Sequence, residues 1–386
     1  MPKIGFDARR AFLNQSGLGN YSRDVVRSIL KFYPGYKTFL YTPDTSRLFR
    51  DIFKEPQVRL KRPKRNRKQR FESTASPLNP IRAYQWRNIE IVKSLIYGKM
   101  DIYHGLSNEL PKKINKFTGA KVVTIHDVIF KSHPNDFPRF DRYTYHKRIQ
   151  NAVRRADRIV CPSHFTANAL NMHYNVHPER IEFIQPSIQD IFHQGAPTKE
   201  AVQRFTRQRK IEKSYMLCVG DIRHRKNQLN VVKALHLLSE TDIQLVLVGR
   251  SSGSYIQSIK SFIQKENLGE KVIWLNSVST FDLPLLFHGA TALIYPSIIE
   301  GFGLPIGEAM LCGIPVLTTQ NSSMQEIGKD KISYVKANDI HGIAEFITTV
   351  VTHPSSFKYD LSEKERWHFS SERQANELHA LYQRLI

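Results

Sequence analysis

The sequence predicts an α/β protein with two doubly wound domains, each a parallel sheet covered by helices on both faces. Short apolar segments rich in Val and Ile alternate with helical stretches, and they lack the strict in–out alternation of a half-exposed sheet. One array of these segments ends near residue 184, and a second begins near residue 215. Two successive βαβ arrays indicate two domains. Ligands of such sheets bind at the carboxyl ends of the strands, so residues directly after strands are the functional candidates.

The expected strands fall into two groups separated by an irregular stretch. The pattern is lost between Ile188 and Val202, which we take as the linker. This predicts an N-terminal domain at 1–190 and a C-terminal domain at 200–365. The expected strands are 3–8, 37–42, 101–104, 121–126, 158–162 and 180–184 in the first domain, and 215–219, 244–248, 272–275, 292–295, 315–318 and 333–335 in the second.

Composition narrows the class of protein. The chain has 386 residues, of which 41% are hydrophobic and 24% charged, which is typical of a globular protein. We expect no signal region and no membrane-spanning segment, because no apolar run approaches the roughly 20 residues that a bilayer requires. The 3 cysteines lack metal or redox spacing, which favours reduced thiols in a cytoplasmic protein. The net charge of +22 attracts polyanions or an anionic membrane leaflet.

Two glutamates, Glu300 and Glu308, lie on either side of a glycine-rich turn that follows an apolar strand. A strand that runs into Gly-Phe-Gly-Leu-Pro and then a helix offers backbone N–H groups to an anion, and Pro305 suits the first turn of that helix. A carboxylate accepts two hydrogen bonds from vicinal hydroxyls, so one glutamate suits a sugar and the other a ribose. The segment therefore indicates a nucleotide-sugar site, although the same residues also fit an ordinary strand–loop–helix with solvated glutamates.

The segment Glu-Gly-Phe-Gly-Leu-Pro-x-x-Glu-Ala-Met resembles the E-x7-E signature of the retaining glycosyltransferases of family 4, and especially bacterial mannosyltransferase-like group 1 enzymes. The resemblance implies the GT-B fold, with two doubly wound Rossmann-like domains facing across a cleft. It also implies a nucleotide-diphospho-sugar donor, transfer with retention, and no metal ion. In the resembling enzymes the terminal helix, here 371–386, packs back on the N-terminal domain.

The resemblance assigns roles within this segment. Glu300 becomes a catalytic residue that holds sugar hydroxyls, and Glu308 binds the ribose of the donor. The backbone amides of Phe302, Gly303 and Leu304 contact donor oxygens.

A basic segment follows the first expected strand of the second domain. Arg223, Arg225 and Lys226 place positive charge where a strand ends in glycine. Arginine contacts phosphate oxygens in a bidentate manner and lysine acts as a point charge, so these cations suit a departing diphosphate. The alternative is a solvated basic loop. The family's Gly-x5-Lys segment overlays Gly220 and Lys226, but Asp221 stands where many members have arginine, which leaves Arg223 or Arg225 as the second phosphate ligand.

Two further candidates lie in the first domain. Gly17 and Gly19 are expected in a loop between the first strand and a helix, where the absence of Cβ atoms allows phosphate or sugar to approach, or where they only form a tight turn. His126 ends a central strand, where a histidine is often structural. The resembling family has a histidine there that contacts a donor hydroxyl and supports charge at the anomeric carbon, so we expect His126 to be catalytic, with Asp127 capping or orienting it.

The acceptor side is less defined. Segments 103–107 and 161–164 follow strands and could line an acceptor pocket, although Ser163 is better explained as the N-cap of the next helix. No motif supplies a carboxylate nucleophile. Retaining transfer proceeds through a covalent intermediate or by front-face departure and attack, and the missing nucleophile favours the front-face route.

Basic residues also cluster away from these motifs. Segment 59–70 holds eight cations in twelve positions and is expected to be a loop, and the helical stretch 139–155 is a second cluster. Each cation contributes roughly 1 kcal/mol of attraction near an anionic leaflet. We expect an anionic membrane surface as the partner, with nucleic acid or mere solvation as alternatives.

The sequence thus predicts a retaining, metal-independent hexosyltransferase with no cofactor. It would transfer a hexose, by preference mannose, from a GDP- or UDP-linked donor to a glycan or lipid-linked acceptor in cell-surface polysaccharide or lipopolysaccharide synthesis. We expect it at the inner face of the cell membrane. The alternatives are a nucleotide-sugar epimerase-like GT-B enzyme and a catalytically silent polyanion-binding protein.

Overall fold

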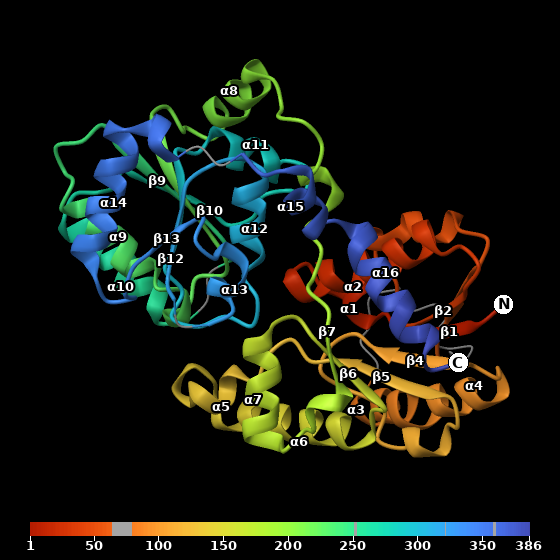
Figure 1. Cartoon of the computed structure of the whole chain (residues 1–386). Coiled ribbons are helices and arrows are strands. Elements are labelled where there is room, and N and C mark those ends of the chain that lie inside the picture. The colour runs from red at the N-terminus through yellow and green to blue at the C-terminus, as the bar shows by residue number, and fades with distance from the viewer. Residues whose placement is uncertain (64–78, 251–252, 321, 358–359) are drawn as a thin grey trace. The chain divides into compact units, whose positions relative to one another are not determined.

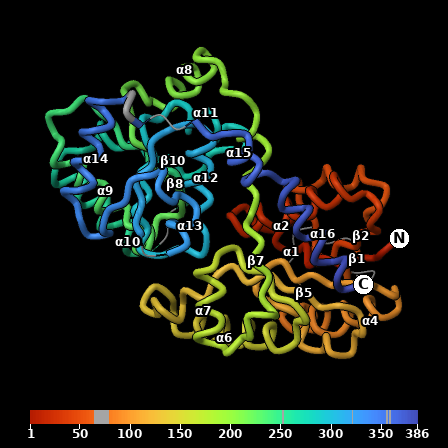
Figure 2. The backbone as a smooth tube through the Cα atoms, viewed as in Figure 1, coloured from red at the N-terminus to blue at the C-terminus, as the bar shows by residue number. Residues whose placement is uncertain are grey.

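The computed structural model describes residues 1–63, 79–250, 253–320, 322–357 and 360–386. The chain forms two compact units (Figure 1). Unit 1 comprises Met1–Ser187 and Ser370–Ile386, and unit 2 comprises Ile188–Phe369. The backbone passes from unit 1 to unit 2 after the last strand of the first sheet and returns to unit 1 with the final helix (Figure 2).

Within the described residues, unit 1 contains a 7-stranded sheet with the order β3-β2-β1-β4-β5-β6-β7, and every neighbouring pair is parallel. The order reverses direction at β1, as it does in doubly wound sheets. The strands are β1 (Lys3–Asp7), β2 (Lys37–Tyr41), β3 (Val58–Lys61), β4 (Ile102–Gly105), β5 (Ala120–Thr124), β6 (Arg158–Cys161) and β7 (Ile181–Phe183).

Helices cover both faces of this sheet (Figure 1). Alternate strand residues point to opposite faces, so Phe6 and Ile102 pack on one side while Tyr103 and Val123 pack on the other. One face carries α1 (Arg9–Leu13), α2 (Gly17–Phe32), η1 (Arg47–Lys54) and α16 (Ser371–Gln383), and the other carries η3 (Trp86–Glu90), α4 (Ile91–Tyr97), η4 (Ile114–Lys116), α6 (Arg139–Arg155) and α7 (His164–Tyr174). The remaining elements are α3 (Pro80–Gln85), α5 (Ile129–Ser132), η5 (Pro134–Asp136) and η6 (Pro178–Arg180).

The final helix α16 belongs to unit 1. Leu378 and Tyr382 are fully buried in the same apolar cluster as residues of β1 and α2. The Tyr33 hydroxyl donates to Oδ1 of Asn376 at 2.8 Å, which adds a polar contact between α2 and α16.

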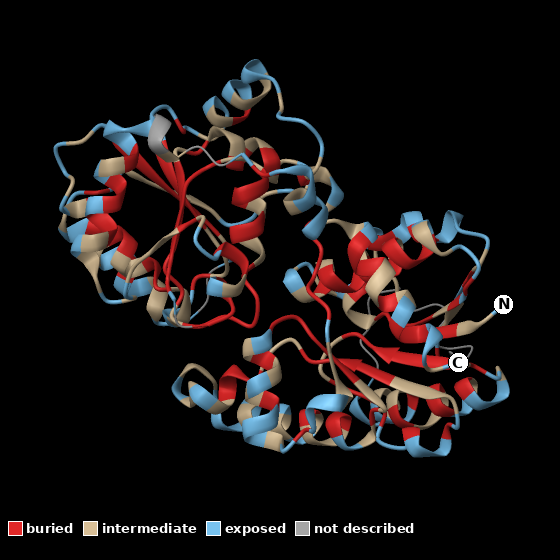
Figure 3. Cartoon of the chain, viewed as in Figure 1, coloured by how far each residue is buried: buried red, intermediate tan, exposed pale blue. Residues whose placement is uncertain are grey.

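Within the described residues, unit 2 contains a 6-stranded parallel sheet with the order β10-β9-β8-β11-β12-β13. The four central strands are largely buried, as Figure 3 shows for β9, whereas the residues of the edge strands β10 and β13 are half-buried. The strands are β8 (Ser214–Val219), β9 (Ile243–Val248), β10 (Val272–Leu275), β11 (Ala292–Tyr295), β12 (Val316–Thr318) and β13 (Ser333–Tyr334).

Two apolar clusters bury the faces of this second sheet. Leu217 and Leu293 contribute to one cluster, and their sequence neighbours Cys218 and Ile294 contribute to the other. The first cluster contains α8 (Lys199–Arg207), α11 (Leu283–Gly289), α12 (Leu304–Leu311) and α13 (Met324–Gly328), and the second contains α9 (Gln228–His236), α10 (Tyr255–Lys265) and α14 (Ile340–Thr352). The remaining elements are η7 (Asp190–Phe192), η8 (His224–Lys226), η9 (Pro354–Phe357) and α15 (Glu363–His368).

The predicted fold class is confirmed, because both units are parallel sheets with helices on two faces. Each expected strand corresponds to an observed one to within a few residues. The expected loop at 59–70 is wrong at its start, because residues 59–61 belong to β3, which pairs with β2. Charged side chains are common on such edge strands because they block pairing with another chain. Residues 64–70 lie outside the described part of the chain.

Candidate active site

The side chain of Glu300, in the loop after β11, is buried against two cations. Its Oε2 lies 2.8 Å from Nη1 of Arg225, and its Oε1 lies 2.7 Å from Nζ of Lys226. The three side chains are only 10%, 18% and 13% exposed, so water screens their attraction weakly. One predicted catalytic residue and two predicted phosphate ligands are therefore in direct contact.

Backbone contacts hold the loops after β8 and β11 together at this point. The Ile298 N–H donates to the carbonyl of Arg225 at 2.8 Å, and Nη1 of Arg225 donates to the carbonyl of Ile299 at 2.6 Å. Asn227 has a left-handed backbone, with φ of 62°, and its side chain donates to the carbonyls of Pro296 and Ala337. The two cations are thus positioned by the same loop that carries Glu300.

Tyr295, the last residue of β11, completes the surroundings of Lys226. The ammonium group of Lys226 donates a hydrogen bond to the Tyr295 hydroxyl and lies 4.6 Å from the centroid of its ring. Tyr295 is only 2% exposed. Sequence reasoning missed this residue, although its place at the carboxyl end of a predicted strand was a usable signal.

The electrostatics keep Glu300 ionised. Burial raises the pKa of its carboxyl group, but Lys226 and Arg225 outweigh that effect and lower the pKa to about 2. Burial lowers the pKa of Lys226, and the attraction of Glu300 opposes that effect. The site therefore contains two positive charges and one negative charge, so its net charge is positive by one.

The glycine-rich turn leads directly into α12. Gly303 precedes the helix with φ of 121°, a conformation that side-chain-bearing residues rarely adopt. Ser323 Oγ lies 2.9 Å from the carbonyl oxygen of Glu300 and 2.7 Å from that of Phe302, so its one proton is shared between them and holds the turn in place. Leu304 is the first residue of α12 and Glu308 is a half-buried residue within that helix. Ser323 is a second residue that sequence reasoning missed.

Gly220, at the end of β8, also has a positive φ, of 140°. A Cβ atom there would lie 3.3 Å from Cε of Lys226, so a side chain would press on the lysine. Arg223, the third predicted phosphate ligand, is exposed and precedes η8. Of the three predicted cations, Arg225 and Lys226 are the two that the structure places against Glu300.

The glycines of unit 1 are not where the sequence predicted them. A short helix, α1, follows β1, and Gly17 and Gly19 lie in the first turn of α2 rather than in a loop. A Cβ atom on Gly19 would lie 1.9 Å from the carbonyl oxygen of Asn14, so the close packing of α2 against the preceding chain requires glycine there. The expected glycine loop is therefore wrong in its local structure.

His126 follows β5 and is held by the loop after β4. Its Nε2 lies 2.8 Å from the carbonyl of Leu106 and its backbone N–H donates to Oδ1 of Asn108 at 2.7 Å. A carbonyl partner requires the proton on Nε2, so Nδ1 is the acceptor nitrogen of the ring. Burial lowers the pKa of His126 to about 4, so the ring is neutral at physiological pH. Asp127 Oδ1 accepts from the N–H of Ile129, the first residue of α5, at 3.2 Å.

The other strand-end residues of unit 1 have structural partners. The ring of His104 has two hydrogen-bond partners: Nδ1 lies 2.7 Å from the Tyr382 hydroxyl, and Nε2 lies 2.9 Å from Oγ1 of Thr124. The same Oγ1 of Thr124 lies 3.0 Å from the Tyr21 hydroxyl. Ser163 Oγ accepts from the Thr166 N–H at 3.1 Å, as predicted for an N-cap.

The glutamates and the cations belong to unit 2, whereas Gly17, Gly19 and His126 belong to unit 1. That the two groups meet around one donor stays a prediction. Within the described residues, no three or more His, Cys, Asp or Glu side chains form a group that could hold a metal ion. No helix in the same described ranges has the length and apolar character needed to cross a bilayer.

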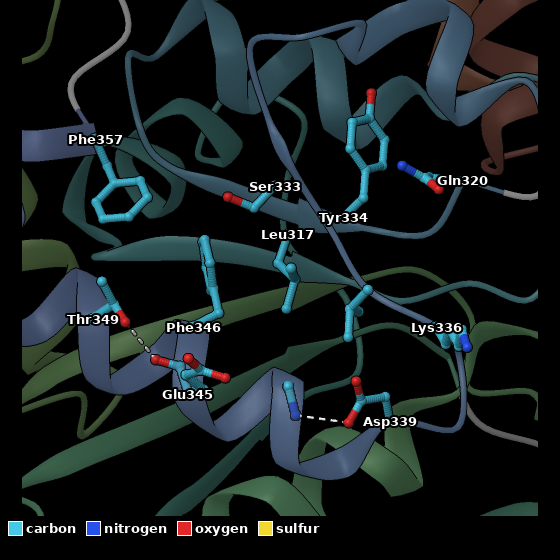
Figure 4. Close-up of a pocket in the computed structure, with 12 residues that line it drawn as sticks. Leu317, Gln320, Ser333, Tyr334, Lys336, Asp339, Glu345, Phe346, Thr349 and Phe357 are labelled. Atoms are coloured by element: carbon cyan, nitrogen blue, oxygen red, sulfur yellow. Dashed lines mark hydrogen bonds between the residues drawn. The ribbon is translucent and has the colours of Figure 1, made fainter.

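A cavity of about 550 Å³ opens elsewhere in unit 2, between β13 and α14 (Figure 4). Its lining includes Tyr334, Phe346, and Asp339, whose Oδ1 accepts from the Gly342 N–H at 2.8 Å and caps α14. None of the predicted site residues lines this cavity. The ion-paired cluster around Glu300, and not this cavity, carries the groups suited to sugar-phosphate chemistry.

The chain is thus an α/β protein of two doubly wound units, with an ion-paired cluster at the strand ends of the second unit, where enzymes of this architecture bind ligands. Comparison with known families identifies it further: residues 16–190 match the family described as "Glycosyltransferase Family 4", and residues 200–368 match "Glycosyl transferases group 1". The chain belongs to this family of glycosyltransferases.

Curated relatives and solved structures agree with this assignment. The chain is 28% identical to the O-antigen chain mannosyltransferase B of Escherichia coli over 64% of each chain, slightly less than two thirds of that protein's length. It is 25% identical to the O-antigen chain mannosyltransferase RfbU of Salmonella typhimurium over 69% of this chain and 70% of that protein.

Two solved structures share the fold over all of this chain. They are a sucrose-phosphate synthase of Thermosynechococcus elongatus (TM-score 0.77, 19% identity, 99% of that chain) and Anabaena HepE in complex with UDP-glucose (TM-score 0.70, 15% identity, 98% of that chain).

Proposed function

We propose that the protein is a retaining glycosyltransferase that moves a hexose from a nucleotide-diphospho-sugar to a glycan or lipid-linked acceptor. The contact of Glu300 with Arg225 and Lys226 carries this proposal. Two cations that share one carboxylate leave one net positive charge at the site, and a diphosphate is an anion of suitable charge. As the bond to the sugar breaks, negative charge collects on the departing diphosphate, and cations placed there stabilise the transition state.

The remaining residues take complementary roles. Glu300 holds hydroxyls of the donor sugar, because each oxygen of an ionised carboxylate has a second lone pair beside the one that faces Arg225 or Lys226. Glu308, on the first turns of α12, binds the ribose, and the amides of Phe302, Gly303 and Leu304 contact donor oxygens. His126, neutral and with its Nε2 occupied by Leu106, contacts a sugar hydroxyl or the forming positive charge through the face or Nδ1 of its ring.

We infer a front-face route for the transfer. The acceptor hydroxyl oxygen forms its bond to the anomeric carbon on the face from which the diphosphate leaves, and its proton passes to the departing phosphate oxygen. The configuration at the anomeric carbon is then retained without a covalent enzyme intermediate. The residues described above act only by binding and charge, so the proposal includes neither a metal ion nor a cofactor.

The relatives guide the proposed substrates. The two relatives named above are O-antigen chain mannosyltransferases. This favours mannose as the sugar, GDP-mannose as the donor, and a role in cell-surface polysaccharide or lipopolysaccharide synthesis. HepE, which shares the fold, is seen with UDP-glucose, which keeps UDP-hexoses as the second choice.

We further propose that the N-terminal unit docks on an anionic membrane surface at the inner face of the cell membrane. On α6, Phe140 and Tyr143 are 77% and 62% exposed and lie among the cations Arg139, Arg142 and Lys147. Aromatic rings enter the headgroup region while cations meet anionic lipid, so this mixture fits a lipid surface better than nucleic acid.

A donor screen tests the activity. GDP- and UDP-sugars are incubated with the protein and a bacterial lipid extract, and release of nucleoside diphosphate is measured with and without the extract. We expect nucleoside diphosphate to be released only when the acceptor is present. Glu300→Ala should abolish this release, and Glu308→Ala should raise the KM for the donor. Release that does not depend on the extract would favour an epimerase-like or hydrolytic enzyme. Indifference of the thermal unfolding midpoint to GDP, UDP and ADP would favour a silent polyanion-binding protein.

Vesicle flotation tests the membrane. We expect binding to vesicles that contain phosphatidylglycerol, loss of binding at high salt, and weaker binding of the Phe140→Ser, Tyr143→Ser double variant. Phe281→Ser is the control, since Phe281 is 79% exposed in unit 2. Equal binding to neutral vesicles would contradict the proposal.

A further inference from the structure

A second buried charge cluster lies in unit 1, at the carboxyl ends of β1 and β4. Glu109, in the loop after β4, is 9% exposed and faces three arginines. Its Oε1 lies 2.6 Å from Nη2 of Arg9 and 3.5 Å from Nε of Arg87, and its Oε2 lies 3.7 Å from Nε of Arg148. Asp7, at the end of β1, is the second carboxylate of the cluster and pairs with Arg9 at 2.5 Å.

The three arginines are not equivalent. Arg9 donates to both oxygens of Asp7 and to Glu109 at 2.5 to 2.8 Å, so its role is structural. Arg87 and Arg148 meet Glu109 only through Nε, at distances longer than a good hydrogen bond, and their side chains are 34% and 39% exposed. Their Nη groups have no hydrogen bond among the contacts of the described residues.

The charges do not balance. Three guanidinium groups face two carboxylates, which leaves one positive charge in the cluster. Burial raises the pKa of Glu109, but Arg9, Arg87 and Arg148 lower it to about 2, so its carboxylate stays ionised and holds two outer arginines side by side against their mutual repulsion. Two guanidinium forks with unused Nη donors are well suited to the oxygens of a phosphate.

The loop that carries Glu109 also holds His126. Leu106 and Asn108 are the hydrogen-bond partners of His126, and a Cβ atom on Gly105 would lie 2.4 Å from the carbonyl oxygen of Glu109, which shows how tightly the loop folds back. Asn151 of α6 donates to the carbonyl of Leu110 at 3.0 Å and ties the helix of Arg148 to the same loop. An anion on these arginines would thus bind at the strand ends that present His126.

We propose that Arg87 and Arg148, held together by Glu109, form a subsite for a phosphate or diphosphate group of the acceptor. This rests on the proposed glycosyltransferase function, in which unit 1 supplies the acceptor side. The phosphate belongs either to a small sugar phosphate or to a polyprenyl-linked acceptor. In both cases the subsite anchors the acceptor by charge while its hydroxyl is left for the transfer.

Phosphate binding tests the subsite without any need for transfer. Inorganic phosphate is titrated calorimetrically into the full chain and into Arg87→Ala, Arg148→Ala and Lys226→Gln. The matched control is Arg154→Ala, which removes an exposed arginine from the same helix as Arg148. We expect one phosphate-binding event to weaken about tenfold in each of the first two variants, the size expected for the loss of a charge-assisted hydrogen bond. That event should persist in Arg154→Ala and in Lys226→Gln.

Arg87→Lys and Arg148→Lys keep the charge if the alanine variants fail to fold, and partial loss of binding in them also supports the subsite. Glucose 1-phosphate and a polyprenyl phosphate in detergent micelles then distinguish the source, because arginine-dependent binding of one or the other identifies it. Phosphate binding that is unchanged in both arginine variants, or absent from the wild-type chain, overturns the proposal. Arginine-dependent phosphate binding in a protein that transfers no sugar would instead refute the proposed function alone.

Discussion

The ammonium group of Lys226 lies 2.7 Å from Oε1 of Glu300, and each residue is a predicted part of the donor site. The carboxylate also pairs with Arg225, so one buried anion serves two buried cations. This pairing lowers the cost of burying the two cations, because a buried charge without a partner is strongly unfavourable.

Replacement of Glu300 by glutamine should destabilise unit 2 and improve its response to anions. The variant leaves Arg225 and Lys226 buried without their counter-ion, a change that costs about 3 kcal/mol or more. We expect a lower midpoint of chemical unfolding that millimolar pyrophosphate partly restores. Glu240→Gln, at an exposed position of the same unit, is the control. Unfolding of Glu300→Gln at the wild-type midpoint would contradict the ion pair.

The ring of His126 should titrate well below a normal histidine. Its pKa is lowered from 6.5 to about 4, chiefly by burial, so the folded state favours the neutral ring. The stability that this contributes is complete above pH 6.5 and is lost as the pH falls toward 4. NMR titration of ring-labelled histidine, with His126→Gln to assign the signal, measures the midpoint. A midpoint near 6.5 would show that the ring is solvated.

Alanine at position 303 should destabilise the turn before α12. The φ of 121° is strained for any residue with a Cβ atom, and the new atom would lie 3.3 Å from Cδ1 of Ile306 and of Ile327. We expect a loss of about 1–2 kcal/mol in the free energy of unfolding. Gly269→Ala should be almost neutral, because a Cβ atom at that position would meet no atom within 4 Å. Equal effects of the two substitutions would show that the turn relaxes freely.

Removal of the Tyr382 hydroxyl should weaken the attachment of α16. In Tyr382→Phe, Nδ1 of the buried His104 loses its partner at 2.7 Å, which costs about 1–3 kcal/mol. Urea unfolding measures the loss, and Tyr97→Phe is the control because Tyr97 is 84% exposed. A variant as stable as the wild type would mean that the hydrogen bond has no net value in this setting.

Local patterns in the sequence were sufficient for the two sheets and for the position of three candidate residues directly after strands; that these residues bind a donor stays a prediction. Glu300, Arg225 and Lys226 follow buried strands, and the carboxyl ends of parallel strands meet at one edge of a sheet. The sequence did not show that they pair with one another, because such a contact depends on how the loops after β8 and β11 fold together.

Other features were missed for physical reasons. Strand β3 alternates apolar and charged residues, because an edge strand needs few apolar contacts. In the sequence it therefore resembles the start of the basic segment that follows it. The side chain of Tyr295 contacts Lys226, and that of Ser323 contacts the backbone of Glu300. Both contacts depend on tertiary packing, and neither residue belongs to a sequence motif. Glu109 and its arginines come from four separate segments, and only the fold brings them together.

The division of unit 1 between the start of the chain and residues 370–386 affects how the protein can be made. A ribosome synthesises residues 1–187 first, but that part lacks Leu378, Leu381 and Tyr382, each of them fully buried in its core. Unit 2 is continuous in sequence, so all of its core residues are synthesised before the final helix that completes unit 1. We therefore expect the usual N-terminal-first order of domain folding during synthesis to be reversed, because unit 2 can be complete while unit 1 still lacks its last helix.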